Sequence, residues 1–320
     1  MRVIVVGYGS IGKRHVCSLL KFNNIAKISI FTGIKEEIPL DGRIQLIDSS
    51  LYSLDDILEH ERFDFAIVAN ETYKHIDTAI TLAEKGIPLF IEKPLSNNLD
   101  RVETLREIID AKKLKVFIAY NLRFLGAIRK AKQELKKGAI GQPYFAKIEV
   151  GQYLPDWRPN SDYRKLYSAD GLRGGGAGLD LSHEVDYMYH LFGMPSSWKV
   201  FKAKVSALEI NSEDIFEGMY QFENGFLCNV HMDYLQRIKK RTLRIIGSNG
   251  TITLDIAGKY MEIVNGREIQ YLTDETFFDT GRTYIDELRH FIDAVKSDTP
   301  PLISLNDGIS VLKLLEDKNV

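Results

Sequence analysis

The stretch RVIVVGYGSIGKRHVCSLL, residues 2–20, decides how the first part of this chain folds. Its β-branched start, Val3 to Val6, predicts a buried strand, and the residues up to Leu20 have the pattern of a helix. Between them lies the G-x-G-x-x-G run Gly7-Tyr8-Gly9-Ser10-Ile11-Gly12. In such loops the first glycine makes the turn, the second lets a pyrophosphate approach the backbone, and the third packs the helix on the strand. The stretch therefore predicts a dinucleotide-binding loop whose helix N-terminus faces phosphates.

The first 120 or so residues alternate between strand and helix patterns. After the opening strand we expect strands at Lys27–Phe31, Phe65–Ala69, Pro88–Ile91 and Val116–Tyr120. Helices are expected after the capping residue Ser53, at Lys74–Lys85 before Gly86, and at Asp100–Ala111. This rhythm predicts an α/β domain, residues 1–120, in which helices cover both faces of a doubly wound parallel sheet.

The second half follows a different pattern. Asn224-Gly225, Asn249-Gly250 and Asn265-Gly266 separate β-rich runs, and Asn-Gly supplies the two positive φ values of a tight hairpin turn. We therefore expect residues 121–320 to form a second, α+β domain with a mostly antiparallel sheet. One helix is expected near residues 178–192. Another, at Tyr284–Lys296, is expected to pack back on the first domain.

Composition excludes several classes of function. The net charge of −2 and the pI of about 6.4 provide no basic field for nucleic acid or an anionic membrane. Cys17 and Cys228 are too few for a disulfide scaffold or a zinc site. Strand-like sequence starts at Arg2, and no apolar stretch is long enough to cross a bilayer. We expect a cytoplasmic protein that binds neither nucleic acid nor membrane.

The ribose end of the expected cofactor site has an unusual composition. About 20 residues after the glycine loop an Asp or Glu normally accepts the ribose 2′-hydroxyl of NAD. Phe31-Thr32-Gly33 occupies that place here, and Lys35 follows before the first carboxylate, Glu36. Without a carboxylate, a 2′-phosphate is not repelled, and Thr32 and Lys35 offer it a hydrogen bond and a positive charge. The sequence favours NADP over NAD, although either cofactor fits the loop.

Glu92-Lys93-Pro94 follows directly after the expected strand Pro88–Ile91. A lysine at this point lies at the carboxyl edge of a parallel sheet, where open α/β sheets bind their ligands. Proline fixes φ and removes a donor, so the strand ends there. Lys93 is therefore a candidate to act on a bound substrate.

A second group of candidates lies at residues 174–186, GGGAGLDLSHEVD. The glycines permit close approach of a ligand to the backbone, and Asp180 and His183 are three apart, on one face of the expected helix. A histidine exchanges a proton near neutral pH, and a carboxylate orients it. The alternative, a metal held by Asp180, His183 and Asp186, lacks a thiol or a second nearby histidine other than His190. No metal is expected.

These motifs together resemble the Gfo/Idh/MocA oxidoreductases. The likeness rests on the glycine loop, Glu92-Lys93-Pro94, Asn121-Leu122-Arg123-Phe124 and the glycine-rich Asp180/His183 segment, and it runs along nearly the whole chain. It implies a Rossmann domain followed by a domain with a large open antiparallel sheet. It also implies hydride transfer between nicotinamide and a hydroxyl or keto carbon of a sugar or nucleotide sugar, and a homodimer or homotetramer formed through that sheet.

The resemblance also implies roles for individual residues. Lys93 would be catalytic, with His183 and Asp180 facing the substrate. Cofactor contacts would come from the glycine loop and from Ala69, Asn70, His75, Glu92, Asn121, Trp157 and Arg158. For His75 and Trp157, plain packing is an equal alternative. Many members space the aspartate and histidine four apart, not three as here, which leaves open which residue takes the proton.

The loop before the glycines bears on the substrate. Tyr163 and Arg164 are candidates to bind a carboxylate or phosphate of the substrate, and loop anchoring is an equal alternative for both. The family resemblance implies that Arg123 also contacts the substrate. The sequence of this region resembles that of family members from surface-polysaccharide pathways. This resemblance points to nucleotide sugars or sialic-acid-like sugars as substrates. The alternatives are a glycosidase-like member with tightly held NAD and a non-catalytic dinucleotide-binding regulator.

Overall fold

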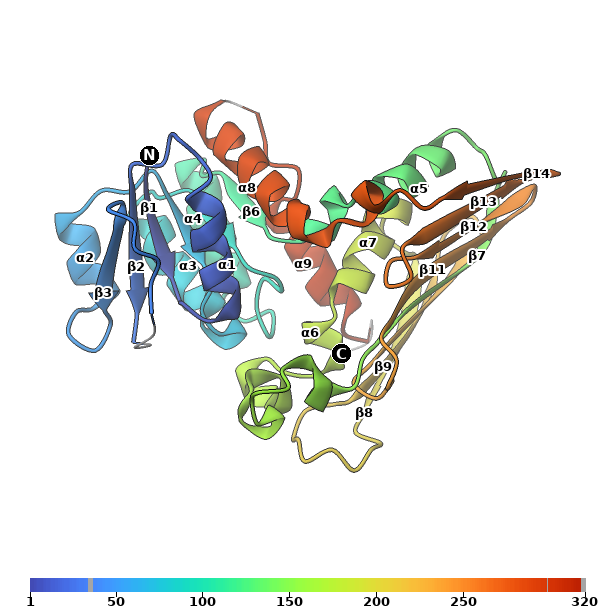
Figure 1. Cartoon of the computed structure of the whole chain (residues 1–320), viewed down its shortest axis with the longest axis horizontal. Helices are drawn as coiled ribbons and strands as arrows, with labels where there is room; N and C mark the ends of the chain where they lie inside the picture. The colour runs from blue at the N-terminus through green and yellow to red at the C-terminus, as the bar shows by residue number, and fades with distance from the viewer. Residues whose placement is uncertain (34–36, 298, 318–320) are drawn as a thin grey trace. The chain divides into compact units, whose positions relative to one another are not determined.

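The computed structural model describes residues 1–33, 37–297 and 299–317. The chain divides into two compact units. Unit 1 comprises residues 1–120 and 284–309, and unit 2 comprises residues 121–283 with the C-terminal segment from Ser310. Figure 1 shows the elements of each unit.

Unit 1 is built on a six-stranded sheet in the order β3-β2-β1-β4-β5-β6. All five neighbouring pairs are parallel. The strands are β1 (Arg2–Val6), β2 (Lys27–Thr32), β3 (Ile44–Asp48), β4 (Phe65–Val68), β5 (Leu89–Ile91) and β6 (Val116–Ile118). Its first helices are α1 (Ser10–Leu19), α2 (Leu54–His60), α3 (His75–Glu84) and α4 (Val102–Lys112). The predicted doubly wound parallel sheet is confirmed, and its strand order reverses between β1 and β4, where such sheets bind ligands.

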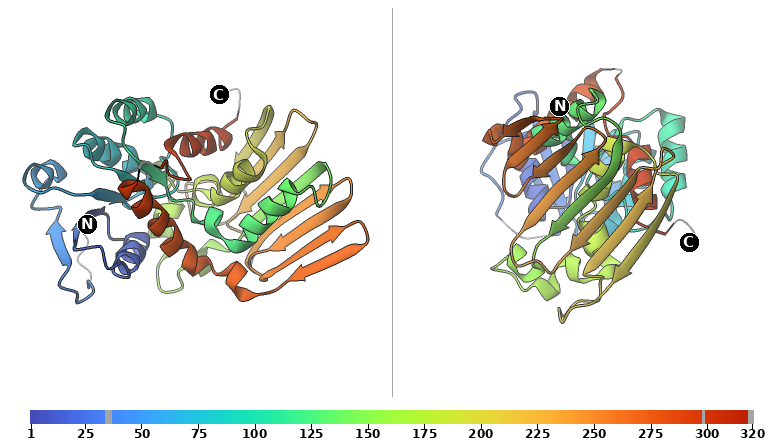
Figure 2. Two further views of the ribbon diagram at one scale, coloured as in Figure 1. Left: turned by 90° about the horizontal axis from the view of Figure 1, so that it is seen from above. Right: turned by 90° about the vertical axis from the view of Figure 1, so that its right-hand side faces the viewer.

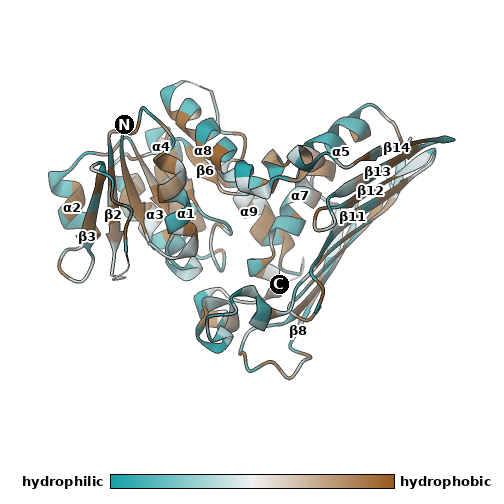
Figure 3. Cartoon of the chain, viewed as in Figure 1, coloured by the Kyte–Doolittle hydropathy of each residue, from teal (hydrophilic) through white to brown (hydrophobic). Residues whose placement is uncertain are grey.

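The sequence prediction missed β3. Its central residues Gln45 and Leu46 are exposed, and only Ile47 is buried, because β3 is an edge strand. The continuous apolar run that marks the inner strands is therefore absent. Figure 3 colours each residue by hydropathy, and hydrophobic residues run along the inner strand β1.

Unit 2 is built on an eight-stranded sheet in the order β14-β13-β12-β11-β7-β10-β9-β8. Its neighbours are antiparallel except β7 and β10. The strands are β7 (Pro143–Gly151), β8 (Ser197–Ala203), β9 (Ile215–Gln221), β10 (Leu227–Asp233), β11 (Lys240–Gly247), β12 (Gly250–Asp255), β13 (Tyr260–Asn265) and β14 (Glu268–Leu272). The prediction of a mostly antiparallel second sheet is confirmed.

The two faces of this sheet differ. One face carries α5 (Gly126–Lys136), α6 (Ala177–Asp180) and α7 (His183–Phe192), and side chains such as Val230, Ile148 and Leu243 are buried against it. In the right-hand view of Figure 2 the strands lie in front, and no described helix crosses them. The second face therefore carries no cover from the described part of the chain.

The three Asn-Gly pairs do lie at antiparallel connections, but their turns differ from the prediction. Gly225 and Gly266 have positive φ, whereas the asparagines before them do not. Gly250 has no positive φ and already belongs to β12. The glycines alone supply the left-handed positions, so the predicted pair of positive φ values is wrong.

The remaining helices are α8 (Thr280–Lys296) and α9 (Leu305–Leu314), with short 3₁₀ turns η1 (Thr72–Lys74), η2 (Asn121–Phe124), η3 (Leu154–Trp157), η4 (Tyr163–Lys165), η5 (Tyr167–Ala169), η6 (Gly171–Arg173) and η7 (Glu275–Phe278). Phe291 of α8 contacts the rings of Phe65, Phe90 and Phe117 in the core of unit 1. None of the helices in the described ranges is long and apolar enough to span a membrane.

Candidate active site

The glycine loop joins β1 to α1, and each of its glycines has a different environment. A Cβ on Gly7, which has φ +100°, would lie 2.5 Å from Asn70 N, so the loop lies directly against the backbone after β4. A Cβ on Gly12 would lie 2.2 Å from the carbonyl oxygen of Gly7. A Cβ on Gly9 would meet nothing within 4 Å. Gly7 and Gly12 are thus required by the fold itself, whereas Gly9 leaves space for a ligand.

The N-terminus of α1 offers unsatisfied donors beside that space. The first backbone bond of the helix runs from Lys13 N to Gly9 O, so the N–H groups of Ser10, Ile11 and Gly12 precede it. The N-cap residue, Gly9, has no side chain to cap this end, and the first turn contains no acidic residue. Tyr8 is buried in the loop, and its burial raises the pKa of its hydroxyl. Backbone donors and the helix dipole therefore favour an anion at this end.

The segment after β4 forms the opposite wall of the loop. Ala69 and His75 are buried, and the His75 ring bridges the carbonyl oxygens of Asn70 (3.1 Å from Nε2) and Pro94 (2.9 Å from Nδ1). Burial lowers the pKa of His75, so it is neutral near pH 7 and donates to one carbonyl at a time. His75 thus links the end of β4 to the Lys93–Pro94 turn, which supports the packing interpretation. The Oδ1 atom of Asn70 is a buried acceptor without a partner among the described residues.

Lys93 directly follows the carboxyl edge of the parallel sheet, after β5. It is half-buried. The Glu92 side chain is buried and turned toward α1, where Oε1 lies 2.5 Å from His15 Nε2. Glu92 Oε2 accepts a 3.1 Å bond from the backbone N–H of Lys93. The Glu92 carboxylate therefore pairs with the His15 ring in this structure.

Thr32 is the last residue of β2 and is buried, in register with Asp48 at the end of β3. The Asp48 carboxylate accepts hydrogen bonds from the N–H (2.8 Å) and hydroxyl (2.7 Å) of Ser50. Lys35, the other residue expected at the ribose, lies outside the described residues. Asp48 was not considered from the sequence because β3 was not predicted.

In unit 2 the glycine-rich segment does not run into one continuous helix. α6 ends at Asp180 and α7 begins at His183, with Leu181 and Ser182 between them. The single helix expected over residues 178–192 is therefore wrong, and a shared helical face does not relate Asp180 to His183. Gly176 has φ +113°, and a Cβ there would lie 2.2 Å from Glu213 Oε2, so this glycine is required by both conformation and packing.

Asp180 is buried between two tyrosines that the sequence analysis did not single out. Its carboxylate accepts hydrogen bonds from Tyr167 and from Tyr234, the latter at 3.0 Å. Burial and then the Asp180 charge raise the pKa of both hydroxyls, which remain donors at neutral pH. His183 is half-buried at the first position of α7. The sequence carries no signal for these tyrosines, because they are 13 and 54 residues from Asp180.

Two residues expected near cofactor or substrate are buried in unit 2. The guanidinium of Arg123 makes hydrogen bonds of 2.7–3.1 Å to the fully buried carboxylate of Asp186. The side-chain amide of Asn121 donates to the hydroxyl of Thr283 at 2.6 Å. Asp186, named from the sequence as part of the weak metal alternative, is the counterion of Arg123.

The aromatic loop is held by its own contacts. Trp157 donates from Nε1 to Gln152 O at 3.0 Å and packs edge-on against Tyr234. Arg158 is exposed. The Tyr163 hydroxyl accepts from Glu209 N (3.2 Å), and Arg164 pairs with Asp162 and Glu209, both at 2.8 Å. These contacts favour loop anchoring for Trp157, Tyr163 and Arg164.

The expected residues thus form two groups. In unit 1 the structure gathers the glycine loop, Ala69, Asn70 and His75, and links them through His75 to the Lys93–Pro94 turn. In unit 2 Asp180 lies with Tyr167 and Tyr234, and Trp157 packs on the same Tyr234.

A doubly wound parallel sheet with this loop defines a Rossmann-type dinucleotide-binding protein. Family models agree along the chain: residues 1–120 match "Oxidoreductase family, NAD-binding Rossmann fold" and residues 128–253 match "GFO/IDH/MocA C-terminal domain". The chain belongs to the GFO/IDH/MocA oxidoreductase family, which confirms the resemblance found in the sequence.

Relatives match over nearly the whole chain. The myo-inositol 2-dehydrogenase of Thermotoga maritima is 26% identical, over 98% of this chain and 94% of its own. The NAD(+)-dependent scyllo-inositol 2-dehydrogenase of Bacillus subtilis is 24% identical, over 95% and 89%. Among solved structures, the WlbA dehydrogenase of Bordetella pertussis, in complex with NADH and UDP-GlcNAcA, has a TM-score of 0.83 at 19% identity and covers 98% of this chain and 93% of its own. At that identity the structural match supports the fold alone.

Proposed function

We propose that this protein is an NAD(P)-dependent oxidoreductase that transfers a hydride between nicotinamide and a hydroxyl or keto carbon of a sugar or nucleotide sugar. The observation that carries the proposal lies within unit 1. The glycine loop, with open space at Gly9, and Lys93 follow strands β1 and β5 of one parallel sheet, so both lie at its carboxyl edge. Ligands of such sheets bind at that edge, next to the point where the strand order reverses.

The residues present fit a dinucleotide. The unsatisfied N–H groups at the start of α1 would hold the pyrophosphate, and the space at Gly9 would admit it. The buried, unpartnered Oδ1 of Asn70 is an acceptor for a hydroxyl or amide group of the cofactor. When bound, the nicotinamide supplies the hydride acceptor or donor.

The chain's own residues handle the proton. Oxidation of a carbinol removes a hydride from carbon and a proton from the hydroxyl oxygen, and reduction delivers both. We assign Lys93 to hydrogen-bond that oxygen and His183 to take or relay the proton. We assign Asp180 a positioning role in the site, because its carboxylate accepts hydrogen bonds from the hydroxyls of Tyr167 and Tyr234. Positioned acid–base groups contribute ~10²–10⁴-fold to rate.

Replacement of Lys93 tests the assignment. Lys93→Met should lower kcat at least ~100-fold while the dissociation constant for the reduced cofactor changes little. Lys85→Met, at an exposed lysine after α3, is the matched control and should retain wild-type kcat. Substantial turnover by a folded Lys93→Met protein would contradict the role of Lys93. Turnover of sugars and sugar nucleotides is monitored by the absorbance of reduced nicotinamide. A protein that binds cofactor but turns over none of them would favour the non-catalytic dinucleotide-binding regulator instead.

We propose NADP as the preferred cofactor. No carboxylate stands at Thr32 or Gly33, and the nearest one in register, Asp48, accepts two hydrogen bonds from Ser50. A carboxylate placed at the end of β2 would repel a 2′-phosphate. Thr32→Asp should therefore lower kcat/KM for NADP at least ~10-fold relative to NAD, a change of about 1.4 kcal/mol. Wild-type preference for NAD would refute the proposal.

For the substrate we propose a sugar or cyclic polyol, with a nucleotide sugar as the narrower expectation. Support comes from the two named inositol dehydrogenases and from the UDP-GlcNAcA complex of WlbA. Arg158 is exposed beside the Asp180 site and is the cation we assign to an anionic substrate group. We also propose a homo-oligomer formed through the uncovered face of the unit 2 sheet.

A further inference from the structure

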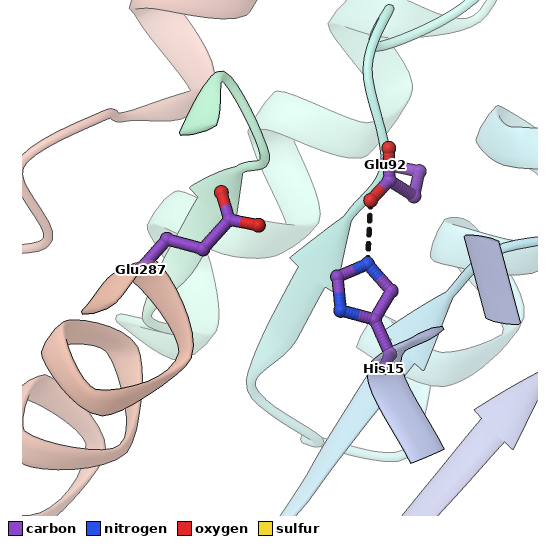
Figure 4. Close-up of side chains that lie close together, drawn as sticks. All are labelled: His15, Glu92 and Glu287. Carbon is purple, nitrogen blue, oxygen red and sulfur yellow. Dashed lines mark hydrogen bonds and ion pairs between the residues drawn. The ribbon is translucent and has the colours of Figure 1, made fainter. Parts of the chain in front are cut away.

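Three buried polar side chains from distant parts of the sequence meet in unit 1. His15 lies on α1, Glu92 follows β5, and Glu287 lies on α8. One nitrogen or oxygen atom from each lies within 4.8 Å of the others. His15 and Glu287 are fully buried, and Glu92 is 6% exposed. Figure 4 shows the carboxylate of Glu287 directed from α8 toward the His15 imidazole.

Two of the three groups are tied to the Lys93 turn. Glu92 Oε1 lies 2.5 Å from His15 Nε2, and Oε2 accepts from the backbone N–H of Lys93. Both oxygens of Glu92 are therefore held, one by α1 and one by the turn itself. The position of the Lys93 backbone thus depends on the ring of His15.

The third group has an unfavourable environment for a charge. Both oxygens of Glu287, and Nδ1 of His15, are buried and have no hydrogen-bond partner among the described residues. Burial, and then the negative charge of Glu92, raise the pKa of Glu287 well above its usual value. An ionised carboxylate in this position would be isolated beside a like charge, which proteins avoid.

The other charged and titratable groups around Glu287 do not offset this. From α1, Arg14 lies over the ring of Tyr284, with its guanidinium carbon 4.5 Å from the ring centroid, and the structure gives it no hydrogen bond to Glu287. Tyr284 itself, on α8, has a raised pKa from burial and the Glu92 charge, so its hydroxyl is neutral. His15 from α1 and Glu92 from the segment after β5 complete the cluster.

We propose that His15, Glu92 and Glu287 form a buried proton-sharing network that positions Lys93, with one proton between His15 and Glu92 and a second on an uncharged Glu287. The proposal rests on the proposed function of Lys93. His15 and Glu287 act here as positioning residues, because their effect on substrate passes through the turn after β5. The alternative to this network is a divalent cation bound by His15, Glu92 and Glu287. Such a cation would require Glu287 to be ionised, because a carboxylate binds a metal in its charged form.

The charge on Glu287 is tested by stability without reference to activity. A group whose pKa is raised in the folded state loses its stabilising contribution as pH rises from its unfolded pKa through the folded one. Glu287→Gln keeps the shape of the uncharged acid and has no proton to lose. The Tm difference, Glu287→Gln minus wild type, should therefore become more positive from pH 5 to pH 9. A difference that becomes more negative, or a stoichiometric metal ion in purified wild type that is absent from the variant, would overturn the network.

The positioning effect is tested by paired substitutions at His15. His15→Leu removes the donor to Glu92, whereas His15→Gln retains an N–H near the position of Nε2. We expect His15→Leu to lower kcat at least tenfold, with the cofactor dissociation constant within twofold of wild type, and His15→Gln to restore most of kcat. Equal kcat in both variants and wild type would refute the positioning. If Lys93→Met were active, the proposed function would fail, while the Tm result would still decide the state of Glu287.

Discussion

The ion pair between Arg123 and Asp186 gives a direct test of whether a buried arginine binds substrate or holds the fold. Both side chains are excluded from water, at 3% and 0% exposure. Removing one partner of such a pair costs roughly 3–5 kcal/mol because the other charge remains buried, whereas removing both costs much less. Arg123→Met should therefore destabilise unit 2 by about that amount, and Arg123→Met/Asp186→Leu should recover most of the loss. Urea unfolding measures both. A mild loss of stability in Arg123→Met with a large rise in substrate KM would instead favour substrate binding.

His231 is expected to make stability depend on pH. Its ring lies between Asp233 (2.8 Å from Nε2) and Glu217 (2.5 Å from Nδ1), and these hydrogen bonds raise its pKa. A raised histidine pKa contributes stability that is present below about pH 6.5, the usual value, and is lost as pH rises through the folded pKa. Wild type should therefore exceed His231→Gln in Tm by more at pH 5.5 than at pH 9. A difference that does not vary with pH, measured by thermal unfolding, would mean that the ring is neutral in the fold.

At the scale of the element, the glycines between β1 and α1 differ in what requires them. Gly12 is required by the packing of the fold, whereas Gly9 is expected to be required by the ligand. A Cβ on Gly12 meets backbone at 2.2 Å, while one on Gly9 meets nothing. Gly12→Ala should lower stability by roughly 1–3 kcal/mol, the usual cost of overpacking. Gly9→Ala should keep the wild-type Tm and weaken cofactor binding at least ~10-fold, because a hydrogen bond to a charged group is worth about 1.5–3 kcal/mol.

The control for this prediction is another open glycine. Gly42 lies between β2 and β3, and a Cβ there also meets nothing within 4 Å. Gly42→Ala should change neither Tm nor the cofactor dissociation constant in a fluorescence titration. If Gly9→Ala bound cofactor as tightly as Gly42→Ala, the space at Gly9 would not be where the pyrophosphate approaches.

The sequence predicted elements well where local patterns carry the information. The apolar runs of β1, β4 and β5 marked a parallel sheet because these strands are buried on both faces. Ser53 caps α2 by accepting from the backbone N–H of Asp56, and the Asp56 carboxylate in turn accepts from the backbone N–H of Ser53. The edge strand β3 lacked such a run. The break between α6 and α7 was missed because Leu181 and Ser182 carry no helix-breaking signal.

At the scale of the whole molecule, sequence separation sets the limit. Motifs within one turn, such as the glycine loop and Glu92-Lys93-Pro94, could be recognised from the sequence alone. Pairings across long separations could not: Tyr234 with Asp180 is 54 residues apart, and Arg123 with Asp186 is 63. The partners of the predicted residues therefore emerge only when strands and helices are placed in space.

The uncovered face of the unit 2 sheet leads to the last prediction, that of self-association. Register places side chains of one face in a row across six strands, from Leu227 on β10 to Phe145, Ile246, Thr251, Val264 and Ile269. The row is apolar except for Thr251, and Leu227, Ile246 and Ile269 are exposed to 38%, 37% and 57%. An apolar row of this length on an uncovered sheet is typical of a surface that a partner buries.

A second copy of the chain is the partner we expect, so the row should lie at a two-fold interface. In a two-fold interface every substitution appears twice, which doubles its cost. Ile246→Lys would bury two ammonium groups and should raise the dimer dissociation constant at least ~100-fold, since a lysine at an interface core is strongly disfavoured. Leu51→Lys, at an equally apolar but more exposed site (73%) in unit 1, is the control and should leave association unchanged. Sedimentation equilibrium at micromolar concentration measures all three proteins. Monomeric wild type, or an Ile246→Lys protein that associates as tightly as wild type, would show that this face of the sheet is not the interface.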